Sequence, residues 1–180
     1  MNKTIIEFIK EIITIIVGIL IALYINNWNE DRKDAKYIDQ IFISMNKELR
    51  ETNYDIDEKL IKQRTLIDSL NFYMKDDELS LSKVIEKSEG IFVPLIKLNS
   101  WKAISNSKIE LIEYDKISVL SDIEEQKELL KMKADKLIDF IYVNYKETGE
   151  IKKEFLKVYM LEIISTEIDL QKDIQKIIVE

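Results

Sequence analysis

The stretch "IITIIVGILIALYINNWNEDRKD", residues 12–34, opens with fourteen uncharged and mostly aliphatic positions, continues with asparagines around one tryptophan, and ends in charges of alternating sign. Such a run is typical of a membrane span, a signal peptide or a buried helix. The uncharged part, Ile12 to Ile25, would rise about 21 Å as a helix, which is short of the roughly 30 Å hydrocarbon core of a bilayer. A helix from Phe8 to Trp28 would span about 31 Å, so the flanks supply the missing length.

The flanks of this run favour a transmembrane anchor. Tyr24 and Trp28 would form an aromatic belt at the membrane interface. A cleaved signal peptide fits less well, because the tail "MNKTIIEFIKE" is not clearly basic and no small-x-small cleavage site follows the apolar run. A buried core helix is the remaining alternative. We therefore expect residues 1–29 to be an N-terminal transmembrane anchor and residues 30–180 to be an α-helical soluble domain.

The polar and small residues of the anchor fall on one side of the expected helix. At 100° per residue they lie within a stripe about 80° wide. The polar stripe consists of Glu11, Thr14, Gly18, Ala22 and Asn29, and Glu7 extends it. Gly18 and Ala22 form a small-xxx-small pair that lets two helices approach closely in lipid. Glu11 would be costly against acyl chains and tolerable against a partner or water.

Three interpretations of the polar stripe stay open. The stripe is either a surface through which membrane helices associate or the lining of a lumen between several copies. Alternatively, one threonine and one glycine are ordinary in a membrane helix, and both glutamates lie among the lipid headgroups.

The remainder of the chain predicts an all-α fold. Only 3 Gly and 1 Pro occur among 180 residues, which favours long helices. Apolar residues recur at steps of three, four and seven from Ile38 to Met74, with Thr52 and Gln63 as weaker positions on the same face. The membrane helix continues into a long helix at about 30–75, followed by short helices at about 80–116 and long helices at about 117–146 and 150–178. These helices predict an α-helical bundle with short helices in its middle.

Helix-capping residues lie at the expected boundaries. Ser80 or Ser82 is a candidate cap for a short helix that Gly90 ends, and Asn99 or Ser100 is a candidate cap for the next one.

Composition excludes many catalytic sites. The chain has no histidine and no cysteine, so a serine triad, thiol chemistry and a zinc site lack their side chains. Its three glycines are isolated, whereas phosphate-binding loops need clustered glycines. The acidic runs Asp55–Glu58 and Asp76–Glu78 offer oxygen ligands for Mg²⁺ or Ca²⁺, although such runs are usually solvated helix faces. We expect no enzyme activity, no catalytic residue, no metal and no cofactor.

The segment "GILIALYINNWNEDRK", with Glu11 upstream, resembles an uncharacterised family of small Bacteroidota membrane proteins classed as a domain of unknown function. In that family a membrane helix ends in a similar "INNWNE" junction and runs into a charged helix. The segment "SWKAISNSKIELIEYDKI", residues 100–117, resembles its mid-chain element, with Asn106 and Ser107 where a Ser-Gly pair is more usual. This chain also lacks the family's long basic tail. The resemblance implies a single-span protein with an α-helical soluble part, and it supplies no reaction.

These observations predict a non-catalytic single-pass membrane protein that self-associates and acts as a membrane-anchored helical scaffold or sensor. The alternative is a homo-oligomeric pore or membrane-perturbing effector lined by the polar stripe. Expected partners are the lipid bilayer, further copies of the chain and proteins that bind the helical domain. A formal net charge of −7 disfavours nucleic acid.

The expected location is the bacterial inner membrane, with the soluble domain in the periplasm rather than the cytoplasm. Basic residues on the two sides of the apolar run are nearly equal in number, so they do not decide the orientation. A short tail followed by a long C-terminal part is commonly threaded as a signal anchor, which favours the periplasm.

Overall fold

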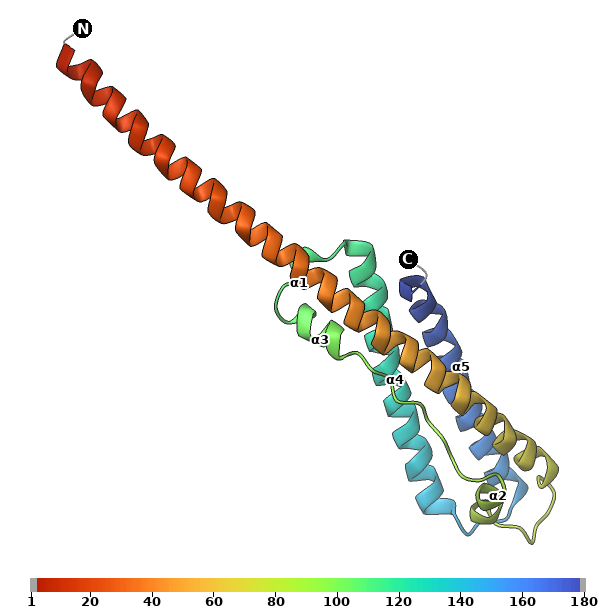
Figure 1. Ribbon diagram of the computed structural model, residues 1–180. Coiled ribbons are helices and arrows are strands. Elements are labelled where there is room, and N and C mark those ends of the chain that lie inside the picture. The colour runs from red at the N-terminus through yellow and green to blue at the C-terminus, as the bar shows by residue number, and fades with distance from the viewer. Residues whose placement is uncertain (1–2, 179–180) are drawn as a thin grey trace. The chain divides into compact units, whose positions relative to one another are not determined.

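The computed structural model describes residues 3–178, and its side chains from residue 7 onward (Figure 1). Within that range the chain forms helices and no strand. The elements in chain order are α1 (Lys3–Phe72), α2 (Leu81–Lys87), α3 (Asn99–Ser105), the 3₁₀ helix η1 (Ile109–Leu111), α4 (Tyr114–Asn144) and α5 (Glu150–Ile178). The predicted fold class, a long N-terminal helix followed by a helical bundle with short middle helices, is confirmed.

The chain divides into two compact units between Phe42 and Ile43. Helix α1 contributes to both units, and its residues from Ile43 onward join the short and long helices that follow. This division lies later than the boundary expected at residue 29, because it separates two compact units and does not mark where the apolar run ends. From residue 7 onward, Met45 is the first fully buried residue of α1. The membrane boundary itself stays a prediction.

The second part of α1 packs against α5 in antiparallel orientation. As residue numbers rise along α1, the numbers of their partners on α5 fall. Arg50 donates to the Ile178 carbonyl at 3.4 Å, Asp57 accepts from Gln171 at 2.8 Å, and Gln63 donates to Glu167 at 2.7 Å. Of the apolar face predicted for α1, Met45, Leu49, Ile56 and Leu70 are fully buried. Ile67 is half-buried, and its neighbour Leu66, which the periodicity did not include, is fully buried in its place.

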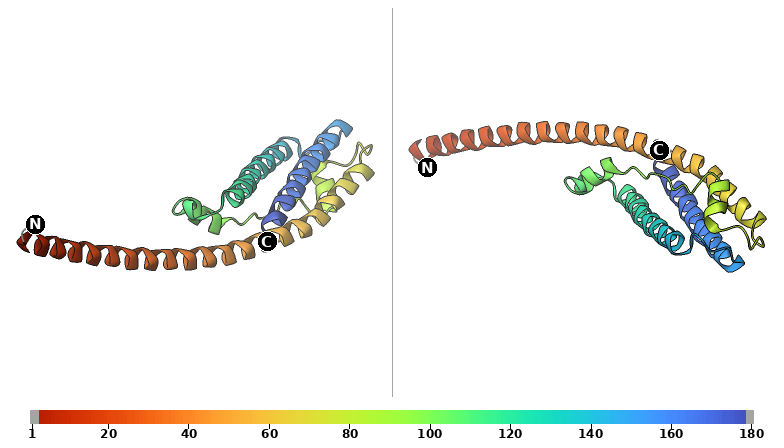
Figure 2. Two further views of the ribbon diagram at one scale, coloured as in Figure 1. Left: turned by 90° about the horizontal axis from the view of Figure 1, so that it is seen from above. Right: turned by 90° about the horizontal axis from the view of Figure 1, so that it is seen from below.

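Helices α4 and α5 form an antiparallel hairpin and lie side by side in both views of Figure 2. Lys133 of α4 donates to the Thr166 hydroxyl at 2.9 Å, and the Phe140 ring lies 5.2 Å from the Tyr159 ring. The two helices supply a large share of the core, including Leu120, Ile123, Leu137, Leu156, Met160, Ile163, Leu170 and Ile174.

Helix α2 ends at Lys87, three residues before the predicted stop at Gly90, and Glu89 is the first residue after it with positive φ (68°). Gly90 has φ 116°, which favours glycine, and its N–H donates to the Ile85 carbonyl at 2.9 Å. Ser80 is the N-cap of α2, but its hydroxyl pairs with the Ser82 hydroxyl at 2.9 Å and makes no capping bond. The Leu81 N–H donates to the Glu147 carbonyl in the α4–α5 loop at 2.9 Å.

Residues 91–98, here called the strap, run along α1 without helix or strand pairing. Polar side chains of α1 bind the strap backbone in place of a neighbouring strand. The Lys97 N–H donates to Thr52 Oγ1 at 3.0 Å, the Leu95 N–H donates to Asp55 Oδ2 at 2.7 Å, and Gln63 Nε2 donates to the Phe92 carbonyl at 2.9 Å. Since residue numbers fall on α1 as they rise on the strap, the two segments are antiparallel. Ile96 and Leu98 of the strap are buried.

The prediction that Asn99 or Ser100 caps α3 is wrong. Leu98 occupies the N-cap position, and the Ser100 N–H is bound by Glu48 Oε2 of α1 at 3.1 Å. Tertiary contact thus replaces the local cap, because α1 brings a carboxylate to the free amides at the start of α3. On its other side, α3 carries Trp101, whose indole N–H donates to Glu124 of α4 at 2.7 Å.

We expect replacement of Leu156 by alanine to lower the free energy of unfolding by about 2–5 kcal/mol, because its side chain is fully buried and leaves a cavity. Leu161→Ala on the same helix is the matched control: Leu161 is 45% exposed, so its change is expected to stay within about 0.5 kcal/mol. Chemical denaturation followed by circular dichroism measures both. Equal losses would contradict the packing of α5 described above.

Candidate functional site

The five residues of the polar stripe lie on the first part of α1, and all five are exposed. Helix α1 is continuous through all five positions, so the spacing predicted from the sequence places them on one side of the helix. The Thr14 hydroxyl donates to the Lys10 carbonyl at 2.9 Å, so it is satisfied within its own helix. A Cβ added at Gly18 would meet no atom within 4 Å, and the helix surface there is open.

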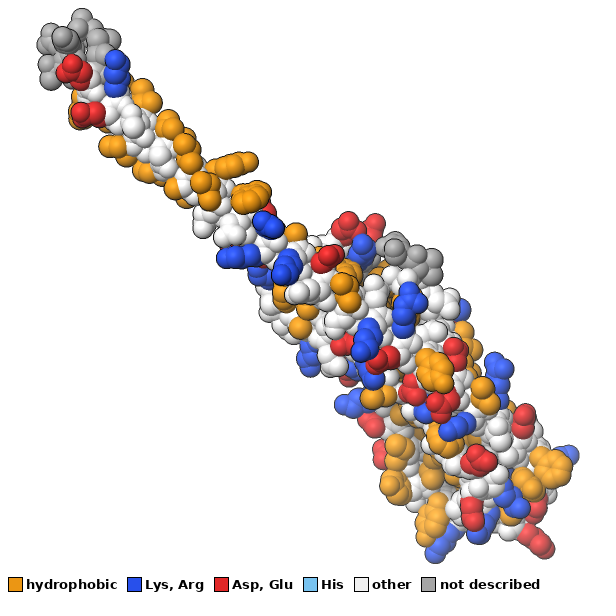
Figure 3. Space-filling model, viewed as in Figure 1, with side chains coloured by type: hydrophobic (Ala, Val, Ile, Leu, Met, Phe, Trp, Pro, Cys, Tyr) orange, Lys and Arg blue, Asp and Glu red, His pale blue; other side chains and the backbone are white. Residues whose placement is uncertain are grey.

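Apolar side chains cover the same part of α1. In Figure 3 orange side chains follow this part of the helix, and charged side chains lie at both ends of the orange stretch. Among the described residues, one helix is long and apolar enough to cross a membrane. Its most apolar window of 18 residues has a mean hydropathy of 2.4, and none of that window is buried. Length and composition therefore suit a membrane span.

Both residues predicted at the membrane interface are exposed on α1. Tyr24 is 73% exposed and Trp28 is 56% exposed. The guanidinium carbon of Arg32 lies 5.9 Å from the centre of the Trp28 ring, which is within the range of a weak cation–π contact. Trp28 therefore combines an apolar ring with a cationic neighbour at the point where the charged residues begin.

The first acidic run does not gather its carboxylates at one place. Asp55 accepts from the strap, whereas Asp57 accepts from Gln171 of α5 at 2.8 Å. Glu58 pairs with Lys59 and with Lys62, both at 3.3 Å. No group of three metal-ligating side chains comes together among residues that the structure describes. The second run forms a turn, in which Asp76 Oδ1 accepts from the N–H groups of residues 78 and 79.

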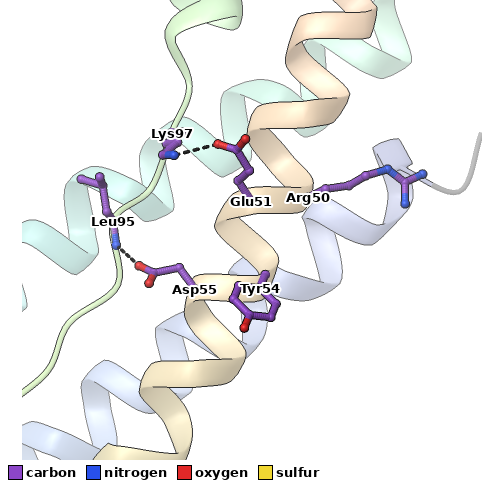
Figure 4. Close-up of a pocket in the computed structure, with 6 residues that line it drawn as sticks. All are labelled: Arg50, Glu51, Tyr54, Asp55, Leu95 and Lys97. Atoms are coloured by element: carbon purple, nitrogen blue, oxygen red, sulfur yellow. Dashed lines mark hydrogen bonds and ion pairs between the residues drawn. The ribbon is translucent and has the colours of Figure 1, made fainter.

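A surface depression of about 500 Å³ lies between α1 and the strap (Figure 4). It is lined by Arg50, Glu51, Tyr54, Asp55, Leu95 and Lys97. Lys97 donates to Glu51 at 2.7 Å, and this hydrogen bond lowers the pKa of the Glu51 carboxyl and raises the pKa of Lys97. Figure 4 shows Arg50 pointing away from the strap. The hydrogen bonds from Leu95 to Asp55 and from Lys97 to Glu51 therefore fasten the strap to α1. The residues that line the depression form no constellation of catalytic groups.

A buried polar pair lies inside the bundle, and sequence reasoning did not single it out as a site. Gln63 of α1 is 1% exposed and Glu167 of α5 is fully buried. Gln63 Nε2 donates to Glu167 Oε1 at 2.7 Å as well as to the Phe92 carbonyl of the strap. Burial raises the pKa of Glu167 to about 7, the hydrogen bond from Gln63 opposes this rise, and the charge of Asp55 adds to it.

One signal in the sequence pointed to this pair. Gln63 interrupts the apolar face of a long helix, and a polar residue at a core position needs a partner. Its partner, Glu167, is 104 residues away on α5, and the sequence does not predict the register of α5 against α1.

Comparison with protein families gives a match. A family described as a family of unknown function (DUF6090) matches residues 11–108, which is more than half of the chain. The matched region contains most of α1, all of α2 and α3, and the strap. Curated proteins and solved structures give no match.

We expect Thr52→Val to loosen the strap, because the fully buried hydroxyl is the acceptor for the Lys97 N–H. The loss should lower the free energy of unfolding by about 1–3 kcal/mol and speed hydrogen exchange at that amide. Thr65→Val is the matched control on the same helix, since the Thr65 hydroxyl is exposed and binds its own helix. Unchanged exchange at Lys97 in the Thr52 variant would contradict this role.

Proposed function

The chain belongs to a family of unknown function (DUF6090), and from that premise we propose that it is a non-catalytic single-pass membrane protein. It self-associates through the polar stripe and acts as a membrane-anchored helical scaffold or sensor. The observation that carries this proposal is the exposed apolar surface of the first part of α1.

Exposure of this surface to water would be energetically costly. Ile15, Leu20 and Ile21 are each more than half exposed, and most neighbouring aliphatic side chains are exposed to a similar degree. Covering one such side chain is worth about 1.5–3 kcal/mol, so a run of them favours lipid strongly over water. A bilayer covers the whole circumference of a helix, whereas a soluble partner covers one side.

The polar stripe supports association between membrane helices. Gly18 and Ala22 leave room for a second backbone, and close packing of small residues is a common basis of helix association in lipid. Glu11 lies on the same side of α1, where a neighbouring copy or water would solvate it better than acyl chains. Because the Thr14 hydroxyl is already bound within α1, that residue needs no aqueous lumen.

A scaffold or sensor role also agrees with the bundle. The polar groups of the strap region bind one another, and the full sequence contains no histidine or cysteine for catalysis. Helix α5 offers an apolar depression of about 460 Å³ that includes Ile151, Phe155 and Val158, and this is a surface for protein partners. The proposed location is the inner membrane, with the bundle in the periplasm.

The test of self-association is the mass of the full-length protein in mild detergent, measured by light scattering corrected for bound detergent. We expect the wild type to be a defined oligomer and Gly18→Ile to reduce it to smaller species, because the added side chain separates the helices. Val17→Ile, which lies about 100° from Gly18 on the helix, is the matched control and should leave the mass unchanged. An oligomer unaffected by Gly18→Ile would refute association through the polar stripe.

Membrane potential distinguishes a scaffold from a pore. We expect cells that express the wild type and cells that express Thr14→Leu to keep the same membrane potential, because a scaffold conducts no ions. Depolarisation by the wild type that Thr14→Leu abolishes, together with an oligomer of at least about four chains, would replace the scaffold by a pore lined by the polar stripe.

A further inference from the structure

The hydrogen bonds around Gln63 do not balance if Glu167 is ionised. Gln63 Nε2 has two N–H groups, and these serve Glu167 Oε1 and the Phe92 carbonyl. Two acceptor atoms, Gln63 Oε1 and Glu167 Oε2, are then left buried without a hydrogen-bond partner. Both acceptor atoms then lack a donor, and the pair carries one buried negative charge; unpaired acceptors and a buried charge are each costly inside a protein.

A single proton corrects both deficits. Protonation of Glu167 removes the buried charge and turns its Oε2 atom from an acceptor into a donor. Gln63 Oε1 belongs to the same amide whose nitrogen already binds Glu167 Oε1. The new donor and the unpaired acceptor are therefore carried by two groups that one hydrogen bond already joins. We propose that Glu167 is a protonation-dependent lock that, in its neutral form, holds α5 and the strap together on α1 through Gln63.

The charged groups around the lock do not compensate an ionised Glu167. On α1, Asp55 adds a further negative charge, and Lys59 lies 3.2 Å from Asp55 and neutralises that residue instead. On α4, Lys133 binds the Thr166 hydroxyl at 2.9 Å and the Glu162 carbonyl at 3.2 Å. On the strap, the ammonium of Lys97 binds Glu51. Among the residues described, Gln63, a neutral group, makes the one hydrogen bond to the Glu167 side chain.

The strap is the element that yields when the lock ionises. Helices keep their internal backbone hydrogen bonds during small movements, whereas polar side chains of α1 hold the strap. Gln63 binds the strap and Glu167 with the same nitrogen atom, so movement that lets water reach the carboxylate also weakens the bond to Phe92. Opening of the strap would uncover Ile96 and Leu98, which are buried when it is closed.

The direction of the pH effect follows from the raised pKa. Burial raises the pKa of Glu167 from 4.5 to about 7, so the closed form binds the proton more tightly than an opened form with the ordinary value. The stabilisation is complete below pH 4.5, declines through the interval from 4.5 to about 7, and is lost above it. The equilibrium constant for closure falls about tenfold per pH unit inside that interval.

Hydrogen exchange of the strap in the full-length protein tests the lock. Protection factors corrected for the intrinsic pH dependence of exchange are compared at pH 5 and pH 8.5. We expect protection of the wild-type strap to fall by a factor on the order of 30 to 100 across this range. Glu167→Gln carries a permanent N–H donor and no charge, so its strap should stay protected at both pH values.

Glu162→Gln on the exposed side of α5 is the matched control and should reproduce the wild-type pH profile. A wild-type profile identical to that of Glu167→Gln would overturn the proposal. If Glu167→Gln fails to fold, the carbon-13 carboxyl resonance of Glu167 in wild-type protein decides the matter. Titration near pH 7 supports the lock, and an ionised carboxylate throughout the range from pH 5 to 8.5 refutes it.

Discussion

Burial of one apolar face of α1 is the constraint on which the bundle depends. From Met45 to Leu70 this face is covered, and the same stretch of helix also supplies the polar groups that hold neighbouring segments. Thr52 and Gln63 lie among the apolar residues and bind the strap backbone, which has no strand beside it. An extended segment can be buried only if its N–H and C=O groups find partners, and α1 provides them. Helix α1 is therefore both the hydrophobic surface and the hydrogen-bonding template for the strap.

The family match covers part of this arrangement. The match ends at residue 108, after α3. It therefore includes the strap and α3, which are both bound directly by side chains of α1. Helices α4 and α5 lie outside the match and complete the core from the other side. The matched region thus joins a candidate membrane helix to a strap-covered helix on one continuous element. The proposed membrane-anchored scaffold would use that continuity of α1 to connect the bilayer with the bundle.

The buried polar groups make this packing specific. Lys153 of α5 is fully buried, and its ammonium donates to the Asp76 carbonyl in the turn after α1. Gln63 and Glu167 link the same two helices nearer the middle of the bundle. Each such group destabilises any alternative register in which it would lose its partner, because an unpaired buried polar group is costly. The polar pairs therefore select one alignment of α5 on α1 among those that apolar contacts alone would allow.

The sequence by itself determined the all-α class, the long first helix, the turn that contains Gly90 after α2 and the apolar run suited to a membrane. These features depend on local periodicity, on the scarcity of Gly and Pro, and on the backbone freedom of one glycine at positive φ. The residues of the polar stripe could be named from the sequence for the same reason, since a single helix fixes their relative angles. Their role in association stays a prediction.

Only the tertiary structure decided how distant polar residues pair. It assigned the start of α3 to Glu48 of α1 where the sequence predicted a local cap, and it joined Gln63 to Glu167 across the bundle. Periodicity predicts which face of a helix is buried, but it contains no information about the register of that face against a partner far along the chain. The hydrogen-bond partners and the raised pKa of Glu167 depend on that register, because both arise from atoms that only folding brings within about 3 Å of each other.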